Sequence, residues 1–246
     1  MRWPLSLLGS ALLVLCTHAA ASQDSLYDAA LAGDIGAVSA LLSGGADIDE
    51  HGDLGTPLHV AAFLGNAALA ELLIEKGADL EAEKDAEGAR PLHVAAAYGN
   101  VAVVALLIEK GANVNAKDIR GRTPLLLAVD QSRFGAAEEI LRHGPEIDEF
   151  DNYHETALHL AVFHSQPKLV VLLLDHGANP NTPGWHGQNA LHQAAAVGPV
   201  EVVQILVERG ADLNGLDVNG RTPLDIAEEN GQKQVAELLR HLKSAN

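Results

Sequence analysis

The stretch Thr56-Pro57-Leu58-His59-Val60-Ala61-Ala62 decides the fold, because the chain returns to it at a fixed distance. Further full or partial copies begin at Arg90, Thr123, Thr156, Asn189 and Thr222. The second position of the phrase, Pro or Ala, falls at 57, 91, 124, 157, 190 and 223, so the spacings are 34, 33, 33, 33 and 33 residues. Such regularity indicates a stack of similar structural units.

A second phrase, Gly-Ala-Asp or Gly-Ala-Asn, completes each period, with a degenerate copy at 144–146. It stands at Gly45, Gly77, Gly111, Gly177 and Gly210. The two phrases delimit a pair of helices. The Thr hydroxyl can cap the first helix and Pro suits its first turn. A left-handed glycine is expected to end that helix, at Gly65, Gly99, Gly198 and Gly231.

The second helix of each pair is predicted from apolar residues at helical spacing, as in 103–107, and ends at the second phrase. About a dozen polar residues remain in each period, such as those around 118–121, and they predict a turn or hairpin that projects from the helices.

These phrases resemble the ankyrin repeat, which has the pattern Thr-Pro-Leu-His-x-Ala and a 33-residue period of a turn and two helices. The resemblance covers about residues 24 to 243. It implies an all-α solenoid of stacked helix-turn-helix units with projecting β-turn or hairpin fingers. A repeat domain at 22–246 would hold units at 24–49 (N-terminal cap), 50–82, 83–116, 117–149, 150–182, 183–215 and 216–246 (C-terminal cap).

The resemblance also implies structural roles for the residues of the first phrase. Each histidine is expected to hydrogen-bond to the Thr hydroxyl and to neighbouring backbone. The structural set is Thr56, Pro57, His59, Pro91, His93, Thr123, Pro124, Thr156, His159, His192, Thr222 and Pro223.

Residues 1–21 predict a secretory signal peptide, with cleavage before Ser22. Arg2 precedes an apolar run over 5–15, which is shorter than the roughly 20 residues that span a bilayer. An uncleaved membrane anchor and lipidation of Cys16 remain alternatives, although Leu15 stands where a lipoprotein signal has Gly, Ala or Ser. We expect an exported protein, periplasmic or secreted, with no integral span after cleavage. The signal and the alanine-rich composition fit a bacterial source.

The charge balance bears on the partner. Lys and Arg number 16 against 33 Asp and Glu, so the formal net charge is −17. Nucleic acid would be repelled, because phosphate binding needs a basic surface. A protein partner with a basic patch fits better, since complementary fields speed association.

The 12 histidines and the carboxylates are the candidates for catalytic or metal-binding residues. The phrase histidines would lie one unit apart, too far to share a metal ion. His154 and His159 are five residues apart, where a zincin motif needs four. The acidic runs fall in turns, where a solvated surface is the simpler interpretation. We therefore predict no catalytic, cofactor or metal residues and no enzyme activity.

Alternative functions remain open at this point. One is an exported protein that binds a metal or another small ligand through turn histidines, namely His51, His154 and His186. Another is a stress-protective periplasmic factor.

Aromatic residues suggest where a partner would bind. Six of the eight that follow residue 21 fall at the ends of the first helices, facing the concave side, or on the turns, where exposed rings anchor protein interfaces. We expect a monomer that binds protein there. The predicted binding set is Phe63, Leu64, Asp85, Glu87, Tyr98, Arg120, Arg122, Tyr153, Phe163, His164, Trp185 and His186. For Phe63 and Phe163, the alternative is that they cover a neighbouring helix end.

Departures from the pattern gather over 117–181. Ser132 and Ser165 replace the helix-ending glycine, and His154 replaces a turn glycine. Glu139 stands where other units have an apolar residue, and a buried carboxylate is costly unless it meets water or a partner. Either Arg142 relieves it, or the helix shifts, or this region is soft.

Overall fold

The computed structural model describes residues 25–245, and these residues form fourteen α-helices, α2 to α15, with one short 3₁₀ turn. The predicted signal peptide, Cys16 and the cleavage site before Ser22 lie outside the described residues. The helices come in pairs, an inner helix that begins at the first phrase or its equivalent and an outer helix that follows it. Two compact units divide the chain between Asn113 and Val114.

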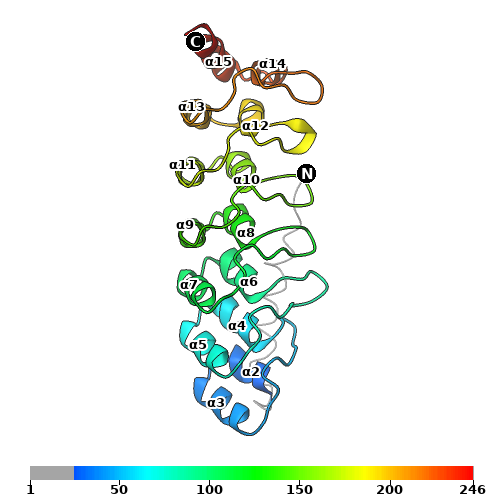
Figure 1. The fold of residues 1–246 in the computed structure, drawn as a ribbon, viewed down its shortest axis with the longest axis vertical. Coiled ribbons are helices and arrows are strands. Elements are labelled where there is room, and N and C mark those ends of the chain that lie inside the picture. The colour runs from blue at the N-terminus through cyan, green and yellow to red at the C-terminus, as the bar shows by residue number, and fades with distance from the viewer. Residues whose placement is uncertain (1–24, 246) are drawn as a thin grey trace. The chain divides into compact units, whose positions relative to one another are not determined.

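The first unit, which ends at Asn113, holds three helix pairs. Its inner helices pack side by side in sequence order, and so do its outer helices (Figure 1). The inner helices are α2 (Leu26–Leu31), α4 (Pro57–Leu64) and α6 (Pro91–Tyr98). The outer helices are α3 (Ile35–Ser43), α5 (Ala67–Glu75) and α7 (Val101–Glu109).

The second unit holds four pairs with the same arrangement, and the turns that precede its inner helices project as fingers (Figure 1). The inner helices are α8 (Pro124–Asp130), α10 (Ala157–Phe163), α12 (Ala190–Val197) and α14 (Pro223–Glu229). The outer helices are α9 (Phe134–Arg142), α11 (Pro167–Asp175), α13 (Val200–Glu208) and α15 (Lys233–Ala245). The short turn η1 (Trp185–Gly187) lies in the finger before α12.

The histidine of the first phrase fixes the start of the inner helix and ties it to the next finger. The Thr56 N–H donates to His59 Nδ1 at 3.1 Å, and the Thr56 hydroxyl lies 2.9 Å from the same nitrogen. His59 Nε2 then donates to the carbonyl oxygen of Ala89, 3.0 Å away. The bonds that the resemblance implied are therefore present.

The same arrangement recurs in the second unit. His159 Nδ1 lies 2.9 Å from the Thr156 hydroxyl, and its Nε2 lies 3.2 Å from the carbonyl oxygen of Gln188. Burial lowers the pKa of His59 and that of His159 to about 4, so both rings are neutral at pH 7.

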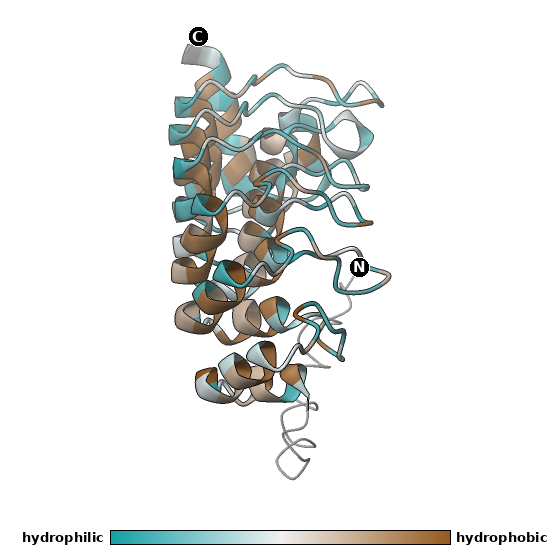
Figure 2. Cartoon of the chain, turned by 60° about the horizontal axis from the view of Figure 1, so that its bottom comes forward, coloured by the Kyte–Doolittle hydropathy of each residue, from teal (hydrophilic) through white to brown (hydrophobic). Residues whose placement is uncertain are grey.

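Small residues let the helices approach closely. Ala61 and Ala62 on α4 are fully buried, as are the corresponding alanine pairs of α6 and α12. Leucine and valine fill the space between the inner and outer helices of each unit, which forms a continuous core. Figure 2 shows this apolar interior, and it shows fingers that are mainly hydrophilic with hydrophobic positions at several tips.

One local prediction was wrong, and one alternative is settled. Of the turn and the hairpin that were expected for the fingers, the structure has the turn: within residues 25–245 the only pairing is an isolated bridge between Gly52 and Gly55. Gly65 and Gly99 end their helices in the left-handed conformation, with φ of 69° and 78°. Gly198, in contrast, is extended at φ −80° and ψ 154°. The reason is Pro199, since a residue before proline is pushed to extended backbone.

The irregular positions keep the backbone of the repeat. Ser132, His154 and Ser165 adopt positive φ of 58°, 59° and 52°, as a glycine would. Of the three alternatives for Glu139, the structure shows the contact with Arg142, whose Nη1 lies 2.6 Å from Glu139 Oε2. Burial raises the pKa of Glu139, but hydrogen bonds from His143 and Arg142 outweigh it and hold that pKa below its ordinary value.

Candidate functional site

The ends of the inner helices in the first unit carry an aromatic pair. The rings of Phe63 and Tyr98 meet edge to face, with centroids 4.7 Å apart and planes at 83°. Leu64 beside them is exposed. Phe63 therefore packs against the neighbouring helix and still lies partly open to solvent. The two rings help to line a small pocket together with Leu54, Lys84 and Val94.

The same two positions of the repeat carry a polar pair in the second unit. His164 Nε2 lies 3.0 Å from Asp130 Oδ1. Burial raises the pKa of Asp130, but hydrogen bonds from His164 and Gln131 hold it below its ordinary value. Phe163 is exposed, and its ring meets His164 edge to face at 5.2 Å.

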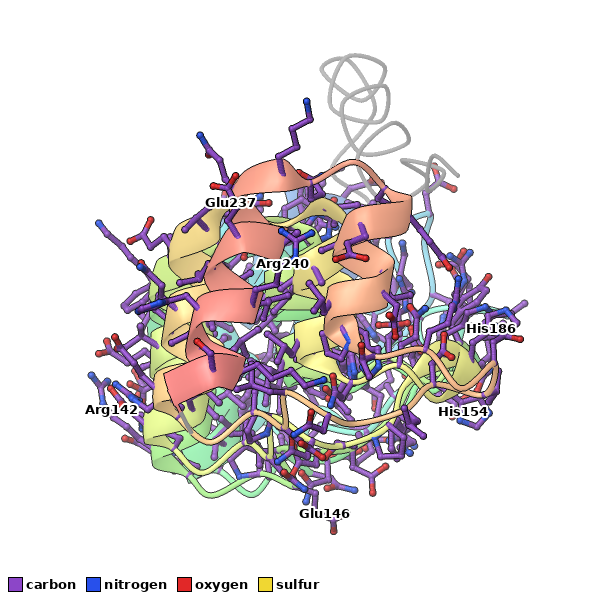
Figure 3. The ribbon with its side chains drawn as sticks, turned by 90° about the horizontal axis from the view of Figure 1, so that it is seen from above. Arg142, Glu146, His154, His186, Glu237 and Arg240 are labelled. Carbon is purple, nitrogen blue, oxygen red and sulfur yellow. The ribbon has the colours of Figure 1, made fainter. Side chains whose placement is uncertain are left out.

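The fingertips of the second unit form a row of apolar side chains. Each finger contributes a large side chain that is at least half exposed, namely Ile119, Tyr153, Trp185 and Val218, and the last finger also exposes Leu216. Backbone bonds join the first finger to the second and the third to the fourth: Asn152 N donates to Arg120 O at 2.8 Å, and Val218 N donates to His186 O at 3.0 Å. In Figure 3, His154 and His186 lie on the side of the fingers, and Arg142 lies on the opposite side.

The corresponding tip in the first unit is acidic. Asp85 and Glu87 stand there, and the Glu87 N–H donates to Asp85 Oδ1 at 2.7 Å. The predicted binding residues thus fall on two chemically different surfaces, one in each unit. Phe63, Leu64, Asp85, Glu87 and Tyr98 belong to the first unit, and Arg120, Tyr153, Phe163, His164, Trp185 and His186 belong to the second.

Arg122 is a correction to the predicted binding set. Only 8% of this residue is exposed, and its Nε and Nη2 lie 2.8 and 2.7 Å from Asp118 Oδ2. Arg221 and Asp217 form the same pair in the last finger. Arg122 therefore closes the base of a finger, and a partner cannot reach it without opening that finger.

Side chains of the turns between outer helix and finger have a role that the sequence interpretation missed. Asp49 and Glu81, expected to be merely solvated, accept hydrogen bonds from the backbone N–H of Asp79 and Asn113 at 3.1 and 2.8 Å. The second unit repeats this turn ladder from Asn115 to Glu146, from Asp148 to Asn179 and from Asn181 to Asp212. The recurrence of Asp, Glu or Asn at this position, roughly once per period, is the signal that could have revealed it.

Residues 25–245 contain no group of three or more His, Cys, Asp or Glu side chains placed to hold a metal ion. His51 lies in the first unit, whereas His154 and His186 lie in the second. Across the same residues, every helix is too short or too polar to cross a membrane.

Comparisons with known proteins agree with this architecture. The crystal structure of the ankyrin repeat domain of Bcl-3, a member of the IkappaB protein family, superimposes with a TM-score of 0.80 at 30% sequence identity, covering 87% of this chain and 97% of that one. The human ASB11 ankyrin repeat domain gives a TM-score of 0.76 at 28% identity, covering 87% and 96%.

Curated relatives match over a shorter stretch. Protein phosphatase 1 regulatory subunit 27 from Homo sapiens and that from Mus musculus are each 40% identical over 62 residues, which is 25% of this chain and 40% of the relative. The chain therefore spans less than half the length of these relatives. Family models described as ankyrin repeats match residues 26–118, 115–184 and 173–227. The chain belongs to the ankyrin-repeat family.

Proposed function

We propose that this chain is a non-enzymatic module that binds a protein through the ends of its inner helices and the tips of its fingers. Ankyrin repeat domains are generally protein-interaction modules. The match to a phosphatase regulatory subunit supports the same class of function, but it covers too little of that protein to indicate a partner.

The row of exposed fingertips in the second unit carries the proposal. Ile119, Tyr153, Trp185 and Val218 project from mainly polar fingers, and backbone bonds join the first finger to the second and the third to the fourth. Large apolar side chains exposed at regular intervals are typical of a protein interface, because covering them removes apolar surface from water and stabilises the complex. Tyr and Trp add a polar edge that suits an interface.

Charge distinguishes the two units as binding surfaces. Residues 25–113 carry fourteen Asp and Glu against four Lys and Arg, whereas residues 114–245 carry eighteen against eleven. A partner segment with basic residues would be drawn to the first unit, near Asp85 and Glu87, and apolar side chains would cover the tips of the second. Export through a signal peptide at 1–21 belongs to the same proposal, and a secreted chain beginning at Ser22 would support it.

A displayed peptide library selected on the purified chain tests this function. Trp185→Ala should weaken the selected peptides at least about tenfold, the effect of losing an interface anchor. Phe134→Ala is the matched control, since Phe134 is also an exposed aromatic residue of the second unit, 41% exposed against 52% for Trp185, but lies on outer helix α9. The proposal fails if no peptide is enriched, or if the two substitutions have equal effects.

A further inference from the structure

One finger of the second unit has an acid at a position where two of the other three fingers have arginine, and the remaining finger has Gln188. In the fingers before α8 and α14, an aspartate binds the arginine four residues later, with Nη2 2.7 Å from Oδ2 in both cases. The finger before α10 has Asp151 and Glu155 at these two positions. The guanidinium that would neutralise Asp151 is therefore replaced by a second carboxyl group.

This acid pair lies at the base of the finger before α10, where Glu155 contacts the Trp185 finger. Asp151 is 5% exposed, and its Oδ1 accepts hydrogen bonds from the N–H groups of Tyr153 and Glu155 at 2.8 and 3.0 Å. The Glu155 carboxyl interacts with the Trp185 backbone N–H and with the side-chain amide of Gln193 on α12. Glu155 thus connects its own finger to the next finger and to the next inner helix.

Two oxygen atoms in this contact lack a donor. Glu155 Oε2 and Gln193 Oε1 are both buried without a hydrogen-bond partner. Both are acceptors, and buried acceptors left unpaired are costly. A proton on Glu155 Oε2 turns this unpaired acceptor into a donor, and Gln193 Oε1 is an unpaired acceptor on the side chain that the carboxyl already contacts.

The titration of Glu155 agrees with this geometry. Burial, and then the negative charge of Asp151, raise the pKa of Glu155 to about 7. A carboxyl with a raised pKa favours the folded form at low pH. That contribution is complete below the ordinary value of 4.5 and is lost as the pH rises towards about 7.

We propose that a proton shared between Glu155 and Gln193 fastens the Trp185 finger, and that its loss above neutral pH loosens this tip. The consequence for binding rests on the function proposed above: a partner that covers Trp185 binds more tightly in weak acid than in weak base. The first unit has no such acid pair, since Ala89 stands at the position of Glu155.

Other ionisable groups on the surrounding elements need separate control. His154 is on the same finger, His186 on the next finger, and His192 on α12. His159 on α10 stays neutral, because burial lowers its pKa to about 4. Burial is the main cause that raises the pKa of Asp151. From the α8 side, Arg122 lowers this pKa and Asp130 raises it.

Fluorescence of Trp185 in the full chain carrying Trp3→Phe tests the proposal without a partner, because that substitution leaves Trp185 as the only tryptophan. Between about pH 5 and pH 8.5, emission should change with a midpoint near 7. Glu155→Gln keeps an uncharged side chain, so its emission should stay in the low-pH form throughout. Asp151→Asn should move the midpoint to lower pH, because it removes the neighbouring charge.

Substitution of the histidines separates their titration from that of Glu155. His154→Asn, His186→Asn and His192→Asn should each retain the transition. A transition that persists in Glu155→Gln, or that disappears only with a histidine, overturns the proposal. Peptide binding is a separate result: if the fluorescence transition follows Glu155 and no peptide is selected, the proton site stands and the proposed function fails.

Discussion

Two pairs of residues at the same place in the repeat show how the units differ. Phe63 and Tyr98 meet as aromatic rings in the first unit, whereas Asp130 and His164 meet through a 3.0 Å hydrogen bond in the second. Both pairs join the end of one inner helix to the end of the next. The repeat therefore fixes which positions touch, while the residues placed there decide whether the contact is apolar or polar.

The left-handed backbone positions give a second contrast. In residues 25–113 every residue with positive φ is a glycine. In the second unit four are not, namely Ser132, His154, Ser165 and His186. A side chain in this conformation costs roughly 1 kcal/mol or more, so the second unit keeps the shape of the repeat at the expense of local strain.

The largest effect on stability is expected from the histidine of the first phrase, which makes the same bonds in both units. His59→Ala and His159→Ala should each lower the free energy of unfolding by about 2–4 kcal/mol, because each removes a buried ring that bonds at both nitrogens. Urea unfolding at pH 7 measures the loss. A loss under about 1 kcal/mol in only one unit would show that the shared phrase does not stabilise both alike.

The pH dependence of these histidines also has a definite sign. The pKa of each ring falls from 6.5 to about 4 on folding, so the folded state resists protonation. The contribution of these neutral rings to the free energy of unfolding is therefore complete above pH 6.5 and is lost as the pH falls towards 4. The alanine variants should show a smaller loss over this range than the unsubstituted chain.

A smaller effect should separate the two helix-end pairs. Double-mutant cycles should give a coupling of about 1 kcal/mol for Phe63 with Tyr98 that does not vary with pH. For Asp130 with His164 we expect about 0.5–1 kcal/mol at neutral pH. Because the pKa of Asp130 lies below 3.8, this contribution is present above that pH and is lost as the pH falls through the lowered value. Equal pH dependence of the two couplings would contradict the contrast.

The smallest effect concerns backbone strain. Ser165→Gly should raise the free energy of unfolding by about 0.5 kcal/mol, and Ser132→Gly should gain less, because the Ser132 hydroxyl accepts a hydrogen bond from Gln166. Gly33→Ser is the reverse substitution in the first unit. A Cβ there meets only Asn66 Nδ2 at an ordinary 3.6 Å, so its loss of about 1 kcal/mol would report strain alone. A gain from Gly33→Ser would refute this account.

The fold was predictable because its signals are local and repeated. Full or partial copies of the first phrase mark the starts of α4, α6, α8, α10, α12 and α14, and their regular spacing predicts where each next unit begins. The errors arose where one neighbour changes the outcome: Pro199 forces Gly198 into extended backbone, and Asp118 draws Arg122 inward. Ile119 and Val218 are absent from the predicted binding set, because the exposed anchors were expected to be aromatic residues. Alignment of the fingers places both opposite Trp185, and it also places Glu155 opposite Arg122.

The turn ladder has a mechanical consequence. Each of its bonds joins a side chain of one turn to the backbone of the turn that follows, for example Asp49 to Asp79 and Glu81 to Asn113. Nothing in the ladder reaches past the adjacent turn. A pulling force applied at one end of a unit should therefore break these bonds one at a time. The unit should lengthen in steps of about one period.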